Sequence, residues 1–360
     1  MQEIYDLALI GLGPAGATLA RVLPQHMRVL ALDKKDGTHR SFRKACGGLL
    51  SDDAQKSLAR YELTLPKSVL VDPQIFAVKT IDLSNGCVQH YQRFYVNLDR
   101  HAFDRWLISL IPPNVEVHEG TRVVSVAREN DLFRIVYWED GVSYTALAHR
   151  LVGADGANSL VRGTFFPNKH PRRYLSVQQW FDETHNSPFY SCVFDPETSD
   201  CCSWSISKDR QFIFGGAFPL DHARARFERQ KEKLAQFGFR FGPVLRTEAC
   251  LVLRPRSPRD FCMGGGDVFL IGEAAGLISP SSLEGISYAI DSAQALADSL
   301  RCDAPHAFAR YRRKTAKMRA KLMFKVLKCP FMYQPTLRAL VMKSGLAALH
   351  MEKEGESGTC

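Results

Sequence analysis

The segment from Ile4 to Asp33 limits the possible fold more than any other stretch. It contains an apolar strand (Ile4–Ile10), a glycine-rich turn, a helix from Pro14 to about Leu23 and a second apolar strand ending at Asp33. Strand, tight turn, helix and strand within about 30 residues form a βαβ unit, whose crossover is right-handed. This segment therefore predicts an α/β fold built on a parallel sheet.

The turn in this unit reads Gly11-Leu12-Gly13-Pro14-Ala15-Gly16. Its first glycine makes the turn, the second lets the backbone approach a pyrophosphate, and the third lets helix and strand pack closely. The helix N-terminus adds free N–H groups and a positive dipole. Asp33, 17 residues after Gly16, is placed to accept hydrogen bonds from a ribose. The turn predicts a dinucleotide cofactor without distinguishing FAD from NAD, and a turn without a ligand is the alternative.

Two further strand-and-turn motifs follow in the chain. Residues 153–162 read GADGANSLVR, and residues 268–280 read VFLIGEAAGLISP. With the first motif they resemble the three fingerprints of the p-hydroxybenzoate-hydroxylase-like flavoproteins. Within that superfamily the chain is most similar to the geranylgeranyl reductase family, through the loop Lys44-Ala45-Cys46-Gly47-Gly48. The bacterial CbrA-like branch is nearest, on the stretches CGGLL, RHAFD, QQWF, SWSISK and LEGISYA.

The resemblance covers residues 1 to about 340 and implies a Rossmann-like FAD-binding domain of three layers (ββα). Between residues 165 and 253 the sequence changes to alternating, aromatic-rich strands, which indicate an antiparallel sheet. We therefore expect a discontinuous FAD domain with an inserted substrate lobe, followed by a helical segment. The expected boundaries are 1–164 and 254–300 for the FAD domain, 165–253 plus strands from about 65–98 for the lobe, 301–350 for the basic helical segment and 351–360 for the tail.

The resemblance also assigns FAD contacts. Asp33 would bind the adenosine ribose, Arg100 the ribityl chain or phosphates, and Val124 the adenine through its backbone. The N–H groups of Gly285 and Ile286 would point from a helix N-terminus toward flavin N1 and O2. Asp155, in the second motif, would shape the pyrophosphate approach. The complete set of expected cofactor residues is Gly11, Gly13, Pro14, Ala15, Gly16, Asp33, Lys34, Lys44, Cys46, Gly47, Gly48, Arg100, Val124, Asp155, Gly272, Glu273, Pro280, Gly285 and Ile286.

The sequence departs from the family pattern at two positions. Glu273 stands where the family usually has Asp, so the carboxylate is one methylene further from the backbone. Ala45 replaces the usual Pro of the cysteine loop, which leaves the φ angle of that loop less fixed. Both departures are compatible with FAD binding.

In the resembling family the flavin gives a hydride from N5 to an isoprenoid C=C bond. Cys46 is the expected proton donor or substrate-positioning thiol; the alternative is that Cys-Gly-Gly only keeps side chains small beside the ring. Trp180, Trp204 and Phe214 are expected in one wall of an apolar pocket. Trp204-Ser205-Ile206-Ser207-Lys208 lacks the second Trp and the Pro of flavin halogenases, which argues against halogenation.

Three functions follow as hypotheses. The first is an FAD-dependent reductase of a polyprenyl or other long apolar lipid. The second is a flavin monooxygenase of the same fold, and the third is a non-catalytic flavin-binding, membrane-associated protein that affects the envelope. The chain has no second GxGxxG motif that would bind NAD(P)H. The sequence therefore leaves the electron donor open between NAD(P)H and another reductant. The oligomeric state stays open.

The charge is concentrated near the C-terminus. The net charge of the chain is +9, and residues 301–350 hold twelve Lys and Arg against one acid. Apolar residues lie between these bases at helical spacing, which fits either an anionic membrane surface or a helical cap over the FAD domain. No nucleic-acid motif accompanies them. The ten cysteines include no CxxC pair, so neither a metal site nor disulfides are expected. We expect a cytoplasmic location, peripheral on the inner face of the membrane.

Overall fold

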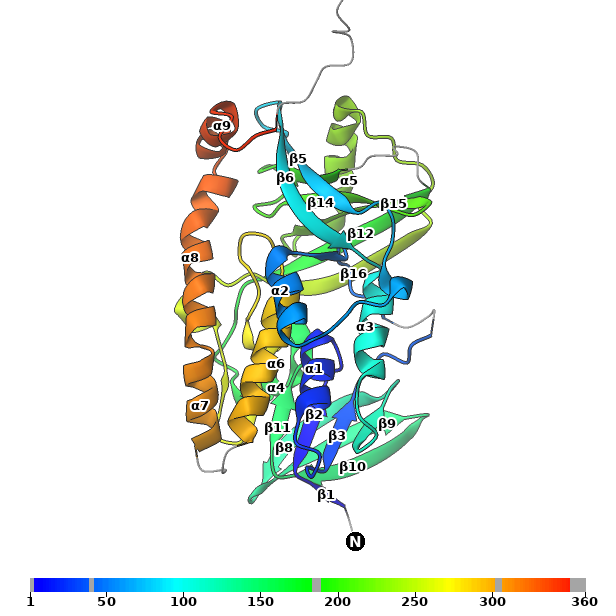
Figure 1. Cartoon of the computed structure of the whole chain (residues 1–360), viewed down its shortest axis with the longest axis vertical. Helices are drawn as coiled ribbons and strands as arrows, with labels where there is room; N and C mark the ends of the chain where they lie inside the picture. Colours follow the sequence, from blue (N-terminus) through cyan, green and yellow to red (C-terminus); the bar gives the residue numbers. More distant parts are fainter. Residues whose placement is uncertain (1–2, 39–41, 183–188, 302–305, 350–360) are drawn as a thin grey trace, which may run out of the picture.

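The computed structural model describes residues 3–38, 42–182, 189–301 and 306–349. Within them the chain forms two lobes, and three C-terminal helices lie along one side of both (Figure 1). The first lobe, at the bottom of Figure 1, contains all three predicted glycine motifs. The second, which we call the sheet lobe, lies above it.

The described strands of the first lobe form a six-stranded sheet and a four-stranded sheet. In the six-stranded sheet only β17 and β18 pair antiparallel. Its order is β17 (Gly264–Gly265), β18 (Val268–Leu270), β11 (Leu151–Gly153), β2 (Leu7–Ile10), β3 (Val29–Leu32) and β7 (Val115–His118). The second sheet has the order β1 (Ile4–Tyr5), β10 (Val142–Ala148), β9 (Leu132–Glu139) and β8 (Arg122–Glu129).

The four-stranded sheet packs on one face of the six-stranded sheet. Three helices cover the opposite face: α1 (Pro14–Val22), α3 (Arg100–Ser109) and α6 (Ile286–Leu300). The central strands β2 and β3 are buried at every position, as expected for parallel strands covered on both faces. One hydrophobic core joins them to inward-facing residues of the four-stranded sheet, such as Phe133 and Ile135. The expected three-layer ββα arrangement is confirmed.

The sheet lobe is an eight-stranded sheet within the described residues, and its chain segments come from 49–97 and 173–253. Its order is β16 (Arg246–Leu253), β12 (Arg173–Asp182), β15 (Gln211–Phe218), β14 (Ser203–Lys208), β13 (Tyr190–Phe194), β5 (Ile75–Asp82), β6 (Cys87–Asn97) and β4 (Leu49–Leu50). All pairs are antiparallel except β13 with β5. This parallel pair is where the two chain segments meet, so the sheet is mixed rather than wholly antiparallel. Helix α5 (Ala223–Leu234) covers one face.

The remaining helices lie in the connections and near the C-terminus. Between strands lie helix α2 (Asp52–Arg60), helix α4 (Leu160–Phe165) and the one-turn helices Lys67–Val69, Gly156–Asn158, Ala235–Phe237 and Pro258–Asp260. The one-turn helix Gly272–Ala275 lies between β18 and α6. The C-terminal helices are α7 (Ala307–Lys314), α8 (Ala316–Tyr333) and α9 (Pro335–Lys343). Arg338 of α9 forms a buried, two-bond ion pair with Asp82 of β5, at 2.8 and 2.9 Å. No described helix is long and apolar enough to cross a membrane.

Candidate functional site

The three glycine motifs meet at the carboxyl ends of β2, β11 and β18. A Cβ on Gly11, whose φ is +98°, would lie 2.7 Å from the carbonyl oxygen of Ala154. A Cβ on Gly272 would lie 2.9 Å from the side chain of Ala15. The turn after β2 therefore contacts both of the other motifs. This edge of a parallel sheet is where open α/β folds bind their ligands.

Gly13 leaves an opening at the start of α1. A Cβ built on this residue meets no atom within 4 Å, and Gly13 is the N-cap of α1 without a side chain to cap the helix. The first N–H groups of a helix have no intrahelical acceptor. An uncapped helix start with open space in front of it fits a phosphate, as the sequence predicts.

Asp33 fastens the glycine turn to the end of β3. Its carboxylate accepts from the N–H of Leu12 at 2.5 Å and from the N–H of Lys35 at 2.8 Å. A carboxylate has about four lone-pair sites, so acceptor capacity is left for a ribose hydroxyl. Lys34, which we expected at the cofactor, is exposed, and its ammonium lies 4.2 Å from the centre of the Phe42 ring. Lys35 points inward instead and pairs with Asp104 at 3.3 Å.

Oδ2 of Asp155 accepts from the N–H of Leu160, the first residue of α4, at 2.7 Å, while Ser159 is the N-cap of this helix. Its Oδ1 is buried and has no hydrogen-bond partner among the described residues. Burial raises the pKa of this carboxyl group. The buried, unpartnered oxygen beside the Gly11 turn fits a ligand hydroxyl at this place. The nearby Arg162 donates to the carbonyls of Ala157 and Ala274, and so joins the second motif to the third.

Lys44 and Arg100 carry positive charge beside the third motif. Lys44 forms an ion pair with Glu273, whose other oxygen accepts from the N–H of Leu253 at 2.9 Å. Burial opposes the charge on Lys44, but the Glu273 carboxylate outweighs it and raises the Lys44 pKa. Burial acts in the same way on Arg100, and its ion pair with Asp104, at 2.9 Å, raises the Arg100 pKa. Both side chains therefore stay positively charged, each paired with a carboxylate.

The cysteine loop packs against the sheet lobe. A Cβ on Gly47 would lie 2.8 Å from the side chain of Ile206. A Cβ on Gly48, whose φ is +63°, would lie 2.4 Å from the carbonyl oxygen of Leu98 and 2.9 Å from Nζ of Lys208. Gly48 is therefore required to be glycine, because its φ is positive and the close atom is backbone, whereas at Gly47 only the end of the Ile206 side chain would have to move.

Lys208, at the end of β14, is a site residue that the expected set lacks. Its buried ammonium donates to Oδ1 of Asn97 at 2.5 Å, to the carbonyl of Leu98 at 2.8 Å and to that of Gly48 at 3.2 Å. Burial lowers its pKa to about 7. In the sequence, Lys208 stands out only as the end of the stretch Trp204-Ser205-Ile206-Ser207-Lys208. The contacts of Lys208 depend on how β6 and β14 are placed relative to each other.

A pocket opens between the two lobes at this point. The cysteine loop lines it with Lys44 and Cys46, α3 with Arg100, and the sheet lobe with Trp180 and Lys208. Arg246 lies over the Trp180 ring at 4.2 Å and also lines the pocket. Where we expected an apolar wall, the lining of this pocket is largely charged: six Lys and Arg side chains line it together with the carboxylates of Asp99, Asp104 and Glu248.

The expected substrate residues are placed differently from one another. Trp180 lines the pocket, and Nε1 of Trp204 donates to Gln178, which also lines it, at 2.9 Å. Phe214 does not reach it. Phe214 pairs with Gln179 on β12, whereas Trp180 pairs with Ile213, so Phe214 faces the other side of the sheet. There it stacks on Phe227 of α5, with 5.4 Å between ring centres. Phe214 therefore lies outside this pocket, in the packing between the sheet and α5.

Four other residues of the expected set do not line this pocket. Val124 is 41% exposed at a register shift between β8 and β9. Pro280 is buried, and its carbonyl accepts from Arg254 at 3.0 Å. Gly285 is the N-cap of α6 and has no side-chain cap of its own. Ile286, the first residue of α6, keeps its predicted place at a helix N-terminus.

Comparisons with solved structures identify the fold. A geranylgeranyl bacteriochlorophyll reductase-like protein from Thermoplasma acidophilum matches with a TM-score of 0.77 and 18% identity, over 94% of this chain and 91% of that one. PqsL of Pseudomonas aeruginosa, a probable FAD-dependent monooxygenase, matches with a TM-score of 0.69 and 18% identity, over 95% and 100%. At this identity the likeness shows the fold alone. The fold is that of FAD-dependent flavoenzymes.

Sequence comparison finds much nearer relatives. No model of a known protein family matches the chain. Protein CbrA of Escherichia coli O9:H4 (strain HS) is 49% identical over 354 residues, which cover 98% of this chain and 96% of that protein. Protein CbrA of Shigella sonnei (strain Ss046) is also 49% identical, over 98% and 100%. At this identity over nearly the whole length of both chains, the protein belongs to the CbrA family.

Proposed function

We propose that this protein binds FAD where the three glycine motifs meet and uses it as an oxidoreductase that reduces C=C bonds of a polyprenyl or other long apolar lipid. The observation that carries the cofactor is the opening at Gly13, in front of the uncapped start of α1. When bound, FAD supplies the electron pair of the reduction, and NAD(P)H or another reductant restores it. The flavoenzyme fold supports the same assignment.

In this proposal, different residues bind different parts of FAD. The N–H groups of Ala15 and Gly16 at the start of α1 bind the pyrophosphate. Asp33 accepts from the ribose, and Glu273 accepts from the ribityl chain. Because Glu273 is paired with Lys44, its carboxylate can accept from a ribityl hydroxyl while the ion pair keeps its buried charge neutralised. Arg100 adds a cation whose several donors suit phosphate or ribityl oxygens.

Reduction of a C=C bond also needs a proton at the second carbon. Cys46 and Lys208 both line the pocket between the lobes. Burial lowers the Lys208 pKa to about 7, so this group can hold or release a proton near neutral pH. Cys46 is our proposed donor or positioning thiol, and Lys208 supplies positive charge and an exchangeable proton beside it.

The lining of the pocket supports a lipid with an anionic head group as substrate. Its basic side chains, such as Lys44 and Arg246, suit that head group. Beside the pocket lies a small buried apolar cluster of Ile206 and Ile213, against which Tyr95 and Trp204 pack. The geranylgeranyl bacteriochlorophyll reductase-like neighbour favours the same substrate class.

A monooxygenase is the second candidate, favoured by the likeness to PqsL. One experiment separates the candidates. The purified protein is loaded with FAD and reduced without oxygen, and geranylgeranyl or undecaprenyl lipid is added while the flavin absorbance is followed. Air is then admitted, and the lipids are analysed by mass spectrometry.

A reductase reoxidises the flavin before air enters, and the lipid gains two hydrogen atoms per reduced bond. A monooxygenase shows no change until air enters, and the product then gains one oxygen atom. Bound FAD with no lipid-dependent reoxidation in either phase indicates the non-catalytic alternative. Failure to bind FAD at all would refute the whole proposal.

A further inference from the structure

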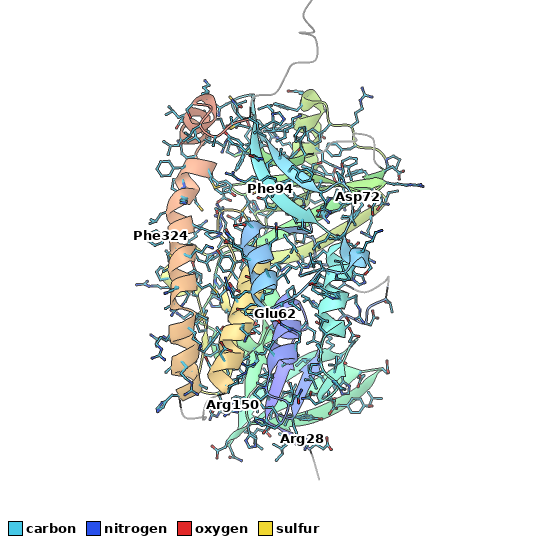
Figure 2. The ribbon with its side chains drawn as sticks, viewed as in Figure 1. Arg28, Glu62, Asp72, Phe94, Arg150 and Phe324 are labelled. Carbon is cyan, nitrogen blue, oxygen red and sulfur yellow. The ribbon has the colours of Figure 1, made fainter. Side chains whose placement is uncertain are left out.

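Exposed apolar side chains gather on the two last helices. On α8, Phe324 and Leu327 are each 67% exposed and Phe331 is 57% exposed. On and after α9, Leu340 is 69% and Leu346 is 75% exposed. Figure 2 shows Phe324 on the outer side of α8. A soluble surface carries single residues of this kind, but a cluster on adjoining helices marks an interaction site.

The outward residues of α8 and of the last turn of α7 follow helical spacing. Residues 313, 317, 320, 324, 327 and 331 are all exposed and recur every three or four positions, so they lie on one face. Arg313 and Lys317 begin this face, and Phe324, Leu327 and Phe331 complete it. The other side of α8 is used for packing, because Leu322 is buried in the core of the first lobe. The exposed face therefore has no structural partner among the described residues.

Positive charge accompanies the apolar side chains. Residues 306–349 contain eleven Lys and Arg and no Asp or Glu. Lys321 pairs with Asp53 of α2, which lies on the inner side. Lys317, Lys328 and Lys343 are exposed and make no ion pair within the described part of the chain. These three lysines lie on the same two helices as the apolar residues.

We propose that this surface, which we call the α8–α9 surface, docks on an anionic lipid bilayer. It consists of the apolar residues Phe324, Leu327, Phe331, Leu340, Val341 and Leu346 and the basic residues Lys317, Lys328 and Lys343. The apolar side chains enter the boundary between head groups and acyl chains, while the lysines bind lipid phosphates. The proposal rests on the surface alone and is independent of the proposed reaction.

The charge distribution favours a bilayer over other occupants. A nucleic acid would bind the lysines but leave the apolar side chains in water. A second copy of the chain, docked face to face, would bring two sets of positive charges together without one acid between them. A bilayer with anionic head groups satisfies both components of the surface.

The helix that carries most of this surface also contacts the loop that leads into α6 and α6 itself. The hydroxyl of Tyr333, in the last turn of α8, donates to the carbonyl of Ser281 at 2.5 Å. Ser281 follows Pro280 in the loop that leads into α6. The ammonium of Lys325 lies 5.3 Å from the centre of the Tyr288 ring of α6. Helix α8 is thus attached directly to the start of α6.

The test uses the full-length protein and vesicles of phosphatidylglycerol with phosphatidylethanolamine, compared with phosphatidylcholine alone, in a sedimentation assay. We expect binding to the anionic vesicles, weakened by salt. The triple variant Phe324→Ser/Leu327→Ser/Phe331→Ser should lose about tenfold or more of this binding. Lys317→Glu/Lys328→Glu/Lys343→Glu should lose a similar amount.

Control variants change exposed residues elsewhere; Val142, Leu220 and Leu245 are 51%, 52% and 47% exposed. Val142→Ser/Leu220→Ser/Leu245→Ser should bind as the wild type does, as should Lys67→Glu/Arg224→Glu. Circular dichroism and thermal unfolding check that each variant is folded. The altered positions are exposed, so unfolding is not expected.

Several results would overturn the proposal. They are absence of binding to anionic vesicles, equal loss in test and control variants, and binding only after residues 351–360 are removed, which would make that segment the occupant. Release of the bound protein by added RNA, with no effect of the apolar variants, would show a nucleic-acid surface. A dimer that the triple variant dissociates, without vesicle binding, would show a second copy.

Discussion

Gly13 and Gly16 are three residues apart in one turn and have different reasons to be glycine. A Cβ on Gly16 would lie 1.8 Å from the carbonyl oxygen of Gly11, so this residue is required by the contact between α1 and the turn. A Cβ on Gly13 would meet nothing within 4 Å, and its φ of −68° suits any residue. Gly16 serves the fold, whereas Gly13 is explained by a ligand.

This difference predicts opposite effects of two alanine substitutions. Gly16→Ala should lower the free energy of unfolding by about 1–3 kcal/mol or more, because backbone must move to admit the methyl group. Gly13→Ala should change it by less than about 1 kcal/mol. Gly13→Ala should instead weaken FAD binding by about tenfold, equal to about 1.4 kcal/mol. Urea unfolding and FAD titration by fluorescence measure the two quantities.

Each outcome bears on a separate claim. An unchanged FAD affinity in Gly13→Ala would contradict the placement of the pyrophosphate at α1. An unchanged stability in Gly16→Ala would contradict the close contact between Gly16 and Gly11.

Among the strands, β14 connects the cysteine loop to the sheet lobe through Lys208. Lys208 donates to three acceptors. Asn97 is the last residue of β6 and Leu98 comes directly after it, and the third acceptor is the carbonyl of Gly48 in the cysteine loop. Three donors on one ammonium meet three acceptors from two segments. The buried lysine thus helps to hold the cysteine loop beside the pocket, together with the N–H of Leu98, which donates to the carbonyl of Gly48 at 2.9 Å.

The Lys208 pKa makes part of the stability depend on pH. Burial lowers it to about 7 in the folded protein, below its value of about 10.4 in the unfolded chain. Between these values the unfolded chain binds more protons, so this group makes stability rise with pH, by at most about 1.4 kcal/mol per unit. Below pH 7 both states are charged and the slope vanishes.

Lys208→Met removes this slope and leaves three acceptors without a donor. We expect a loss of about 1–3 kcal/mol near pH 7, and a difference from the wild type that grows between about pH 7 and 10. Urea unfolding at a series of pH values measures it. Lys67→Met, at an exposed lysine, is the control and should follow the wild-type curve. A wild-type minus Lys208→Met difference that is flat over this range would refute the burial argument.

In the whole molecule, the two lobes share chain segments and core. The chain passes from the first lobe into the sheet lobe at β4 to β6, returns, and enters it again at β12. One hydrophobic cluster joins Tyr174 and Val252 of the sheet lobe to Ala157 and Ile278 of the first lobe. Neither lobe is made from one continuous segment, so we expect them to unfold together.

The four tryptophans allow this to be tested. Trp106 and Trp138 lie in the first lobe, and Trp180 and Trp204 lie in the sheet lobe. Two variants, Trp106→Phe/Trp138→Phe and Trp180→Phe/Trp204→Phe, each report on one lobe by fluorescence. For each variant, the urea transition followed by tryptophan fluorescence should coincide with the urea transition of the same variant followed by circular dichroism. A fluorescence transition separated from the circular dichroism of its own variant would show that the lobes unfold independently.

The sequence by itself determined the βαβ unit, the three glycine motifs, the ββα layers and the presence of a second sheet. These follow from local requirements: a positive φ at Gly11, close packing at Gly16, and apolar runs in β2 and β3 that need cover on both faces. Each can be read within about 30 residues. The motifs also carry the family resemblance, which covers the expected FAD contacts.

The tertiary structure alone decided which side chains share the pocket. Lys208, Asn97 and Trp180 lie on three strands far apart in the chain, and only the strand order brings them toward Cys46. It also turned Phe214 away, because the β12–β15 register fixes which alternate residues face α5. Registers and strand neighbours depend on pairing between distant segments, and no local pattern in the sequence encodes that pairing.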